Sequence, residues 1–253
     1  SEAALRPHCR LLTDYEDMDT IPALLGLRAR ARMLTLRALI ALQEKRTDAA
    51  LADVLTCLRV AAHLQKEPHL ISQLLRTAYV NIAMQPIWEG IQAHRWSGTH
   101  LEKLQEALTS IDLVDSFSRA WRAERIYGAK SLERAANTSI WSRPQVLGYI
   151  GDHEPNRLQA LAWTLIFPKG WVYQNLLRID QHYTTQFFDV FDPANHRILA
   201  SASRKATQAV QQTRRGPYTM LAMVSTPTLL DQNIRVARAQ SGLDLAIIAC
   251  ALE

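Results

Sequence analysis

The chain has 253 residues, of which 48% are hydrophobic and 21% are charged, and this balance excludes a disordered protein. Its formal net charge of +5 comes from 29 basic and 24 acidic residues, an excess that is more typical of a mildly basic surface than of a dedicated polyanion site. No run of about 18 apolar residues occurs, so the sequence predicts no membrane span. Glycine is scarce, and the abundance of alanine and leucine favours long helices.

The first half of the chain predicts five helices. Residues 1–20 are polar and acidic, and we expect them to wrap the surface before the first helix. Proline at position 86 lies inside the third predicted helix and is expected to kink or split it near Met84. Thr99 followed by Glu102 predicts a capping box at the start of the fourth helix. The predicted ranges are about 21–45, 47–66, 68–94, 99–110 and 112–136.

The polar positions of the first predicted helix are strongly basic. Arg28 and Arg32 share one face because they are four residues apart, whereas Arg30 points elsewhere. The basic stripe from Arg28 to Arg37 is a candidate surface for a phosphate backbone, together with a second basic group of Arg204, Lys205, Arg214 and Arg215. They lack interleaved aromatic residues and any known binding motif, so a solvated basic face is the favoured interpretation.

Residues 137–154 interrupt the helical pattern with two glycines and a proline. An irregular stretch of this length is uncommon in a compact helical domain, and such loops are often functional. Asp152, His153 and Glu154 lie within it and are the candidate catalytic residues, because adjacent acids and a histidine can form an acid/base pair or supply metal ligands. The favoured alternative is a solvated polar turn before the next helix.

The second half of the chain predicts further helices and a candidate binding patch. Trp171, Tyr173, Asn175 and Tyr183 form an aromatic and amide-rich group that fits a peptide, sugar or protein partner, or alternatively packs into the core. The last helix has no terminating glycine, asparagine or proline, so we expect the chain to be a fragment of a longer protein. The predicted ranges are about 155–166, 171–188, 201–215, 218–224 and 227–252.

Three cysteines, Cys9, Cys57 and Cys250, are far apart and show no CxxC spacing. Cys57 and Cys250 occupy apolar helical patterns, where a free cysteine behaves as a small hydrophobic residue. We therefore expect no metal site. A single bridge from Cys9 to either of the other two remains open if the compartment is oxidising.

Two resemblances follow from these patterns. The stretch Leu36 to Pro68 resembles one tetratricopeptide-type helical hairpin, with small residues in both helices and a closing proline, although the aromatic signature positions are missing. The segments "PKGWVYQNLLRI" and "ARAQSGLDLAIIACALE", with the residues around 27–76, are similar to uncharacterised helical proteins of planctomycete and verrucomicrobial type. That resemblance implies an extracytoplasmic, periplasmic domain that is membrane-anchored through a segment absent from this chain, and it implies no activity.

These observations predict an all-α fold of about eight to ten helices stacked as hairpins. We expect one domain over 1–253, or alternatively two halves, 1–136 and 155–253, joined by the irregular loop. The expected function is a non-catalytic scaffold or protein-interaction domain of a cell-envelope assembly, without a cofactor and with a protein partner. The alternatives are a hydrolase-type or metal-dependent enzyme with its site in the 137–154 loop, and a nucleic-acid-binding basic face.

Overall fold

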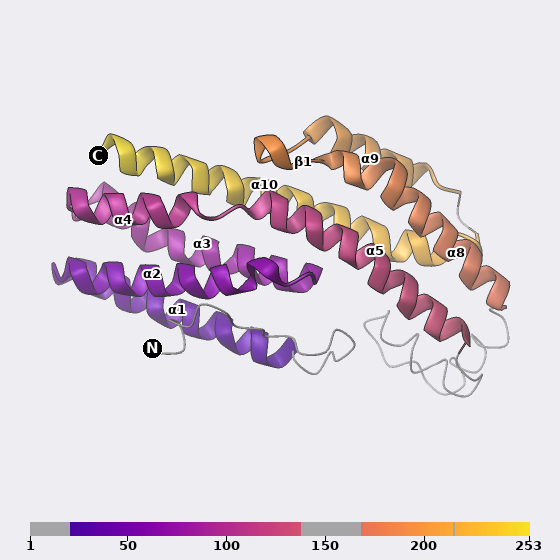
Figure 1. Ribbon diagram of the computed structural model, residues 1–253, viewed down its shortest axis with the longest axis horizontal. Helices are drawn as coiled ribbons and strands as arrows, with labels where there is room; N and C mark the ends of the chain where they lie inside the picture. The colour runs from indigo at the N-terminus through magenta and orange to yellow at the C-terminus, as the bar shows by residue number, and fades with distance from the viewer. Residues whose placement is uncertain (1–20, 138–167, 215) are drawn as a thin grey trace. The chain divides into compact units, whose positions relative to one another are not determined.

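The computed structural model describes residues 21–137, 168–214 and 216–253, and within them the fold is all-α, as predicted (Figure 1). The only strands among the described residues are two antiparallel two-residue segments, β1 (Phe191–Asp192) and β2 (Arg197–Ile198). The described α-helices are α1 (Ile21–Gln43), α2 (Thr47–His63), α3 (Leu70–Gln92), α4 (Gly98–Thr109), α5 (Leu113–Asn137), α8 (Lys169–His182), α9 (Ala200–Gln212) and α10 (Met220–Leu252). No helix in the described ranges is both long and apolar enough to cross a membrane.

The chain divides into two compact units, and each takes more than one stretch of sequence. The first contains the described residues up to Ala120, with Pro193–His196 and Arg235–Glu253. The second contains the described residues of Trp121–Asp192 and Arg197–Ile234. Two boundaries fall inside α5 and α10, because each of these long helices contributes residues to both units, and the other two enclose Pro193–His196. Local sequence patterning carries no signal for such a division.

In the first unit, α1, α2 and α3 pack pairwise against one another, and α2 also contacts α4. The buried positions of α2 recur three or four residues apart, as the amphipathic pattern predicts. Small residues lie where helices come close: Ala38, Ala50 and Ala61 are buried completely. The first three helices appear together in indigo and purple in Figure 1.

Of the two outcomes predicted for Pro86, a kink or a split, the split is wrong, because α3 is one helix from Leu70 to Gln92. A proline inside a helix cannot donate to the carbonyl four residues earlier, which here belongs to Ile82. The hydroxyl of Thr35 in α1 donates to that carbonyl oxygen at 3.2 Å. A hydrogen bond between helices therefore replaces the one that proline removes, and the buried ring of Pro86 adds to the core.

The start of α4 differs from the predicted capping box. Ser97, not Thr99, is the N-cap residue, and its hydroxyl accepts from the His100 amide at 3.4 Å. In return His100 Nδ1 accepts from the Ser97 amide at 3.4 Å, so histidine takes the part expected of Glu102. At the start of α5, Asp112 acts as the N-cap residue, because its Oδ1 accepts from the Asp115 amide at 2.9 Å.

The second unit is built around the buried indole of Trp121 in α5. The rings of Tyr183 and Phe187 lie with centroids 5.5 and 5.3 Å from it, and that of Phe191 lies 6.0 Å away. Tyr183–Phe187 forms a π-helical turn that continues α8, so two aromatic residues four positions apart both reach the indole. A smaller cluster of Leu132, Ala136 and Val172 completes this core.

The last helix is longer than predicted. The sequence indicated a short helix at 218–224 and a second one opening at Pro227, whereas α10 is one helix of 33 residues that includes this proline. A proline removes a single hydrogen bond from a helix. Burial of Leu230 and Val236 beyond it provides apolar packing that offsets this local cost.

Both cysteines in the described ranges are free and buried thiols. Burial raises the pKa of the Cys57 thiol to about 12. Because the thiolate is the reactive form, we expect Cys57 in the folded protein to react with iodoacetamide at pH 8 roughly a thousandfold more slowly than in the unfolded chain. Mass spectrometry of a Cys9→Ser variant, labelled with and without guanidinium, measures this ratio. Equal labelling under both conditions would contradict the buried position.

Candidate functional site

The outward side of α1 carries an apolar stripe. Met33, Leu36 and Ile40 are 72%, 60% and 48% exposed, and their spacing of three and four residues places them on one face. The opposite side of the helix, with Ala31 and Ala38, is buried against its neighbours. Helix α1 is therefore apolar on both sides, although only one side packs within the described residues. A helix with this pattern is normally covered on both sides.

Arginines lie along both edges of this stripe. At 100° per residue, Arg30 and Arg37 follow one edge, and Arg28 and Arg32 follow the other. All four are exposed. Arg37 donates from both Nε and Nη2 to the carboxylate of the buried Asp53 in α2, with 2.7 Å between Nε and Oδ2, so its guanidinium has a fixed position beside the stripe. The result is an apolar seam between two basic margins, which we call the α1 seam (Ala29, Met33, Leu36 and Ile40).

A second exposed apolar stripe occurs on α10. Leu245, Ile248 and Leu252 are again three and four residues apart and are all more than half exposed. Its surroundings differ from those of the α1 seam, because the acidic residues Asp244 and Glu253 lie beside it. Contiguous exposed apolar side chains are the usual mark of a surface that binds another molecule.

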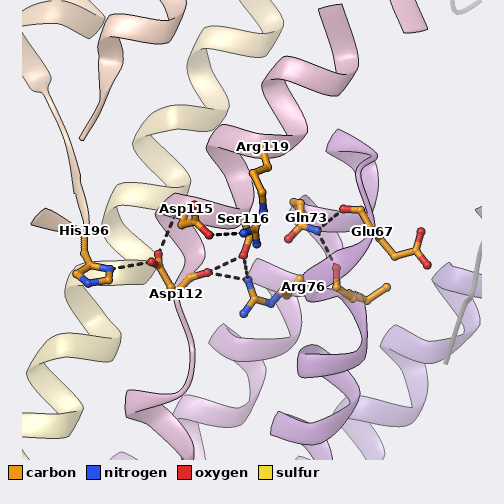
Figure 2. Close-up of polar contacts among 9 residues, drawn as sticks. Glu67, Gln73, Arg76, Asp112, Asp115, Ser116, Arg119 and His196 are labelled. Carbon is orange, nitrogen blue, oxygen red and sulfur yellow. Dashed lines mark hydrogen bonds and ion pairs between the residues drawn. The ribbon is translucent and has the colours of Figure 1, made fainter. Parts of the chain in front are cut away.

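The most unusual polar group in the first unit is Arg76, whose side chain is completely buried between α3 and α5 (Figure 2). Its Nη1 donates to the Ser116 hydroxyl at 2.6 Å and to the backbone carbonyl of Asp112 at 2.8 Å. The Asp112 carboxylate accepts from the Asp115 amide and lies 2.8 Å from Nδ1 of His196. The cluster thus connects α3, the N-terminus of α5 and the segment that contains His196.

A second contact in the same view supports the end of α2. The side-chain amide of Gln73 donates to the carbonyl oxygens of Leu64 and Glu67 at 2.7 and 2.6 Å (Figure 2). These carbonyls lie at the end of the helix before Pro68, where few backbone amides remain to bond with them, although the Leu64 carbonyl also accepts from the Glu67 amide at 3.1 Å. Gln73 therefore caps the preceding helix from the first turn of α3.

Arg76 keeps two donors, Nε and Nη2, without a hydrogen-bond partner among the described residues. Burial lowers the pKa of its guanidinium to about 10, and the nearby Asp112 carboxylate opposes this shift only in part. Burying a charge without full pairing is costly. The net contribution of the Arg76 guanidinium to the free energy of unfolding is therefore small, although the side chain lies in the core.

This arrangement predicts different effects for two substitutions of Arg76. Arg76→Met keeps most of the volume and leaves the Asp112 carbonyl satisfied by the Ser116 hydroxyl, so we expect the free energy of unfolding to change by less than about 1.5 kcal/mol or to rise. Arg76→Ala adds a cavity and should be less stable than Arg76→Met by about 2–5 kcal/mol. Guanidinium unfolding measures both. A large loss in Arg76→Met would show that the charge itself is stabilising.

The candidate catalytic residues Asp152, His153 and Glu154 lie outside the described residues, as does most of the 137–154 loop. Elsewhere, in the ranges that the structure describes, no group of three or more His, Cys, Asp or Glu side chains is placed to hold a metal ion. Two histidines in these ranges each contact a single polar side chain. His100 contacts the Asp48 carboxylate, and His182 contacts the Gln186 side-chain amide.

The structure distributes the four aromatic and amide candidates over three environments. Asn175 is fully buried, and its side chain bonds to the carbonyls of Trp171 and Pro217 and to the amide of Leu221. Tyr183 lies in the core beside Trp121, and burial raises its pKa. Trp171 packs edge-on against Tyr218 at 5.8 Å. Tyr173 is 45% exposed, so the four side chains form no common surface.

The α1 seam was not predicted, because the arginines of this helix are more conspicuous in the sequence than the apolar residues between them. A signal was present: apolar residues recur on the seam side and also on the side of Ala31 and Ala38. The sequence contains no pattern that indicates the burial of Arg76, since an arginine in a leucine-rich helix is normally at the surface.

Comparison of the chain with models of protein families, with curated proteins and with solved structures gave no match.

Proposed function

We propose that this protein is a non-catalytic helical scaffold, an interaction domain of a cell-envelope assembly that holds a protein partner on the α1 seam. The observation that supports this proposal is the exposure of Met33, Leu36 and Ile40 on a helix whose other side is already buried. Burying an apolar side chain of this size contributes about 1.5–3 kcal/mol when it is fully removed from water. Three partly exposed side chains therefore offer a partner several kcal/mol of favourable free energy.

A protein partner fits this surface better than nucleic acid does. A phosphate backbone needs a continuous set of cationic contacts and gains little from aliphatic side chains. Here the two arginine margins are separated by Met33, Leu36 and Ile40, which would remain exposed beneath a phosphate backbone. The enzyme alternative depends on Asp152, His153 and Glu154, and no described residue adds to it.

The proposed setting is the periplasm, with the full-length protein tethered to the membrane by a segment absent from this chain. The support is the resemblance in sequence to membrane-anchored helical proteins. Protease treatment of spheroplasts that express the full-length protein tests it: degradation of this domain without lysis is expected, and protection until lysis would contradict the proposal.

The test of function is a pull-down of the full-length protein from its native membranes after chemical cross-linking, with partners identified by mass spectrometry. We expect one or two stoichiometric partners that are lost in a Leu36→Glu variant. Ile126→Glu is the matched control, because it introduces the same charge at another exposed apolar residue, 54% exposed on α5. A partner-free protein, or partners retained by Leu36→Glu, would contradict the proposal.

A further inference from the structure

We propose that the partner presents a single amphipathic helix with acidic residues on both sides of its apolar face, which packs lengthwise on the α1 seam. This inference rests on the proposed function and specifies the chemistry of the partner. Three observations support it: the spacing of the seam, the positive charges along its margins, and the repulsion that these charges would cause between two copies of α1.

The spacing of the seam fits a helix. Ala29, Met33, Leu36 and Ile40 are separated by four, three and four residues, which is the alternation of the two core positions in a coiled coil. A stripe of this kind covers only two positions in seven, and it is narrower than the face of a helix that lies in a membrane surface. In addition, α1 contains no tryptophan, tyrosine or phenylalanine, the residues that commonly anchor such membrane-bound helices.

The charges beside the seam specify acidic residues on the partner. Arg30 and Arg37 occupy the positions that flank the core on one side, and Arg32 flanks it on the other. In coiled coils these flanking residues form the ion pairs that select the partner. Arg37 is held by Asp53 but its side chain remains 68% exposed, so it is fixed in place and still accessible to a partner carboxylate.

A second copy of this chain does not fit the seam. In a parallel pair of α1 helices, Arg32 of one copy would face Arg37 of the other, and in an antiparallel pair each flanking arginine would face another arginine. Like charges at these positions destabilise a helix pair, whereas opposite charges steer and stabilise it. Glutamates or aspartates at the flanking positions of a different helix satisfy all three arginines.

The test uses a synthetic helical peptide about four heptads long, with isoleucine and leucine at the core positions and glutamate at every flanking position. Repulsion between its glutamates keeps it from pairing with itself at neutral pH. The matched control peptide carries lysine at the same flanking positions. Binding of each peptide to the protein is measured by fluorescence anisotropy at low salt, with wild type, Leu36→Glu and the double variant Arg30→Glu/Arg32→Glu.

We expect wild type to bind the glutamate peptide at least about tenfold more tightly than the lysine peptide, with the preference reduced by added salt. Leu36→Glu should weaken binding by about tenfold or more. The double variant should prefer the lysine peptide, and this gain of binding also shows that the variant is folded. Equal affinity for the two peptides, or an unchanged preference in the double variant, would overturn the inference.

Two further outcomes separate this inference from the proposed function. If neither peptide binds but Leu36→Glu still loses its cross-linked partner, the acidic-helix inference fails and the scaffold function stands. If wild type binds vesicles of phosphatidylglycerol and neither peptide, and Leu36→Glu abolishes vesicle binding, the seam is a membrane contact and the inference is overturned.

Discussion

Trp121→Ala is expected to lower the free energy of unfolding of the second unit by about 3–5 kcal/mol. The indole is completely buried and lies against three aromatic rings, so its removal leaves a large cavity. It also loses the tilted contact with Tyr183 and the edge-on contact with Phe187. Neighbouring residues cannot fill this space easily, because Phe187 is itself completely buried.

Amide hydrogen exchange followed by mass spectrometry measures the effect, because it assigns the loss of protection to particular helices. We expect faster exchange in α8 and α9. The control is Ile126→Ala on the same helix, where the side chain is more than half exposed and the change should stay within about 0.5 kcal/mol. Comparable effects of the two substitutions would show that Trp121 is not the centre of this core.

Asn175→Ala is expected to lower the free energy of unfolding by about 2–4 kcal/mol, a large effect for a residue first considered as a ligand contact. Its side-chain nitrogen donates to two backbone carbonyls, at 2.8 and 2.7 Å, and its oxygen accepts from the Leu221 amide at 2.9 Å. Alanine removes all three bonds in a place without solvent, where lost partners are not replaced by water.

Tyr173→Ala is the matched control for this prediction, since Tyr173 lies two residues away on α8 and is 45% exposed. Its loss should change stability by less than about 1 kcal/mol. Chemical unfolding of both variants makes the comparison. If Asn175→Ala were as stable as wild type, the side chain would be free for a ligand, and the interpretation of Asn175 as a structural clamp between α8 and α10 would be wrong.

The sequence by itself determined the class of fold and most helix positions. The apolar spacing of α2 and α3 and the capping aspartate before α5 are local features, so they could be recognised without a structure. At Pro86 a distant partner changes the local outcome. Pro86 does not break α3 because Thr35, more than forty residues away, bonds to the carbonyl that proline leaves free.

Only the tertiary structure decided which side chains are buried and which remain on the surface. Asn175 and Tyr183 are close in sequence to the exposed Tyr173, but burial against other helices makes them part of the core. Arg76 is charged and yet buried, whereas Leu36 is apolar and yet exposed. The physical reason is that periodicity shows which residues share a face of a helix, and packing against the rest of the chain determines which face is covered.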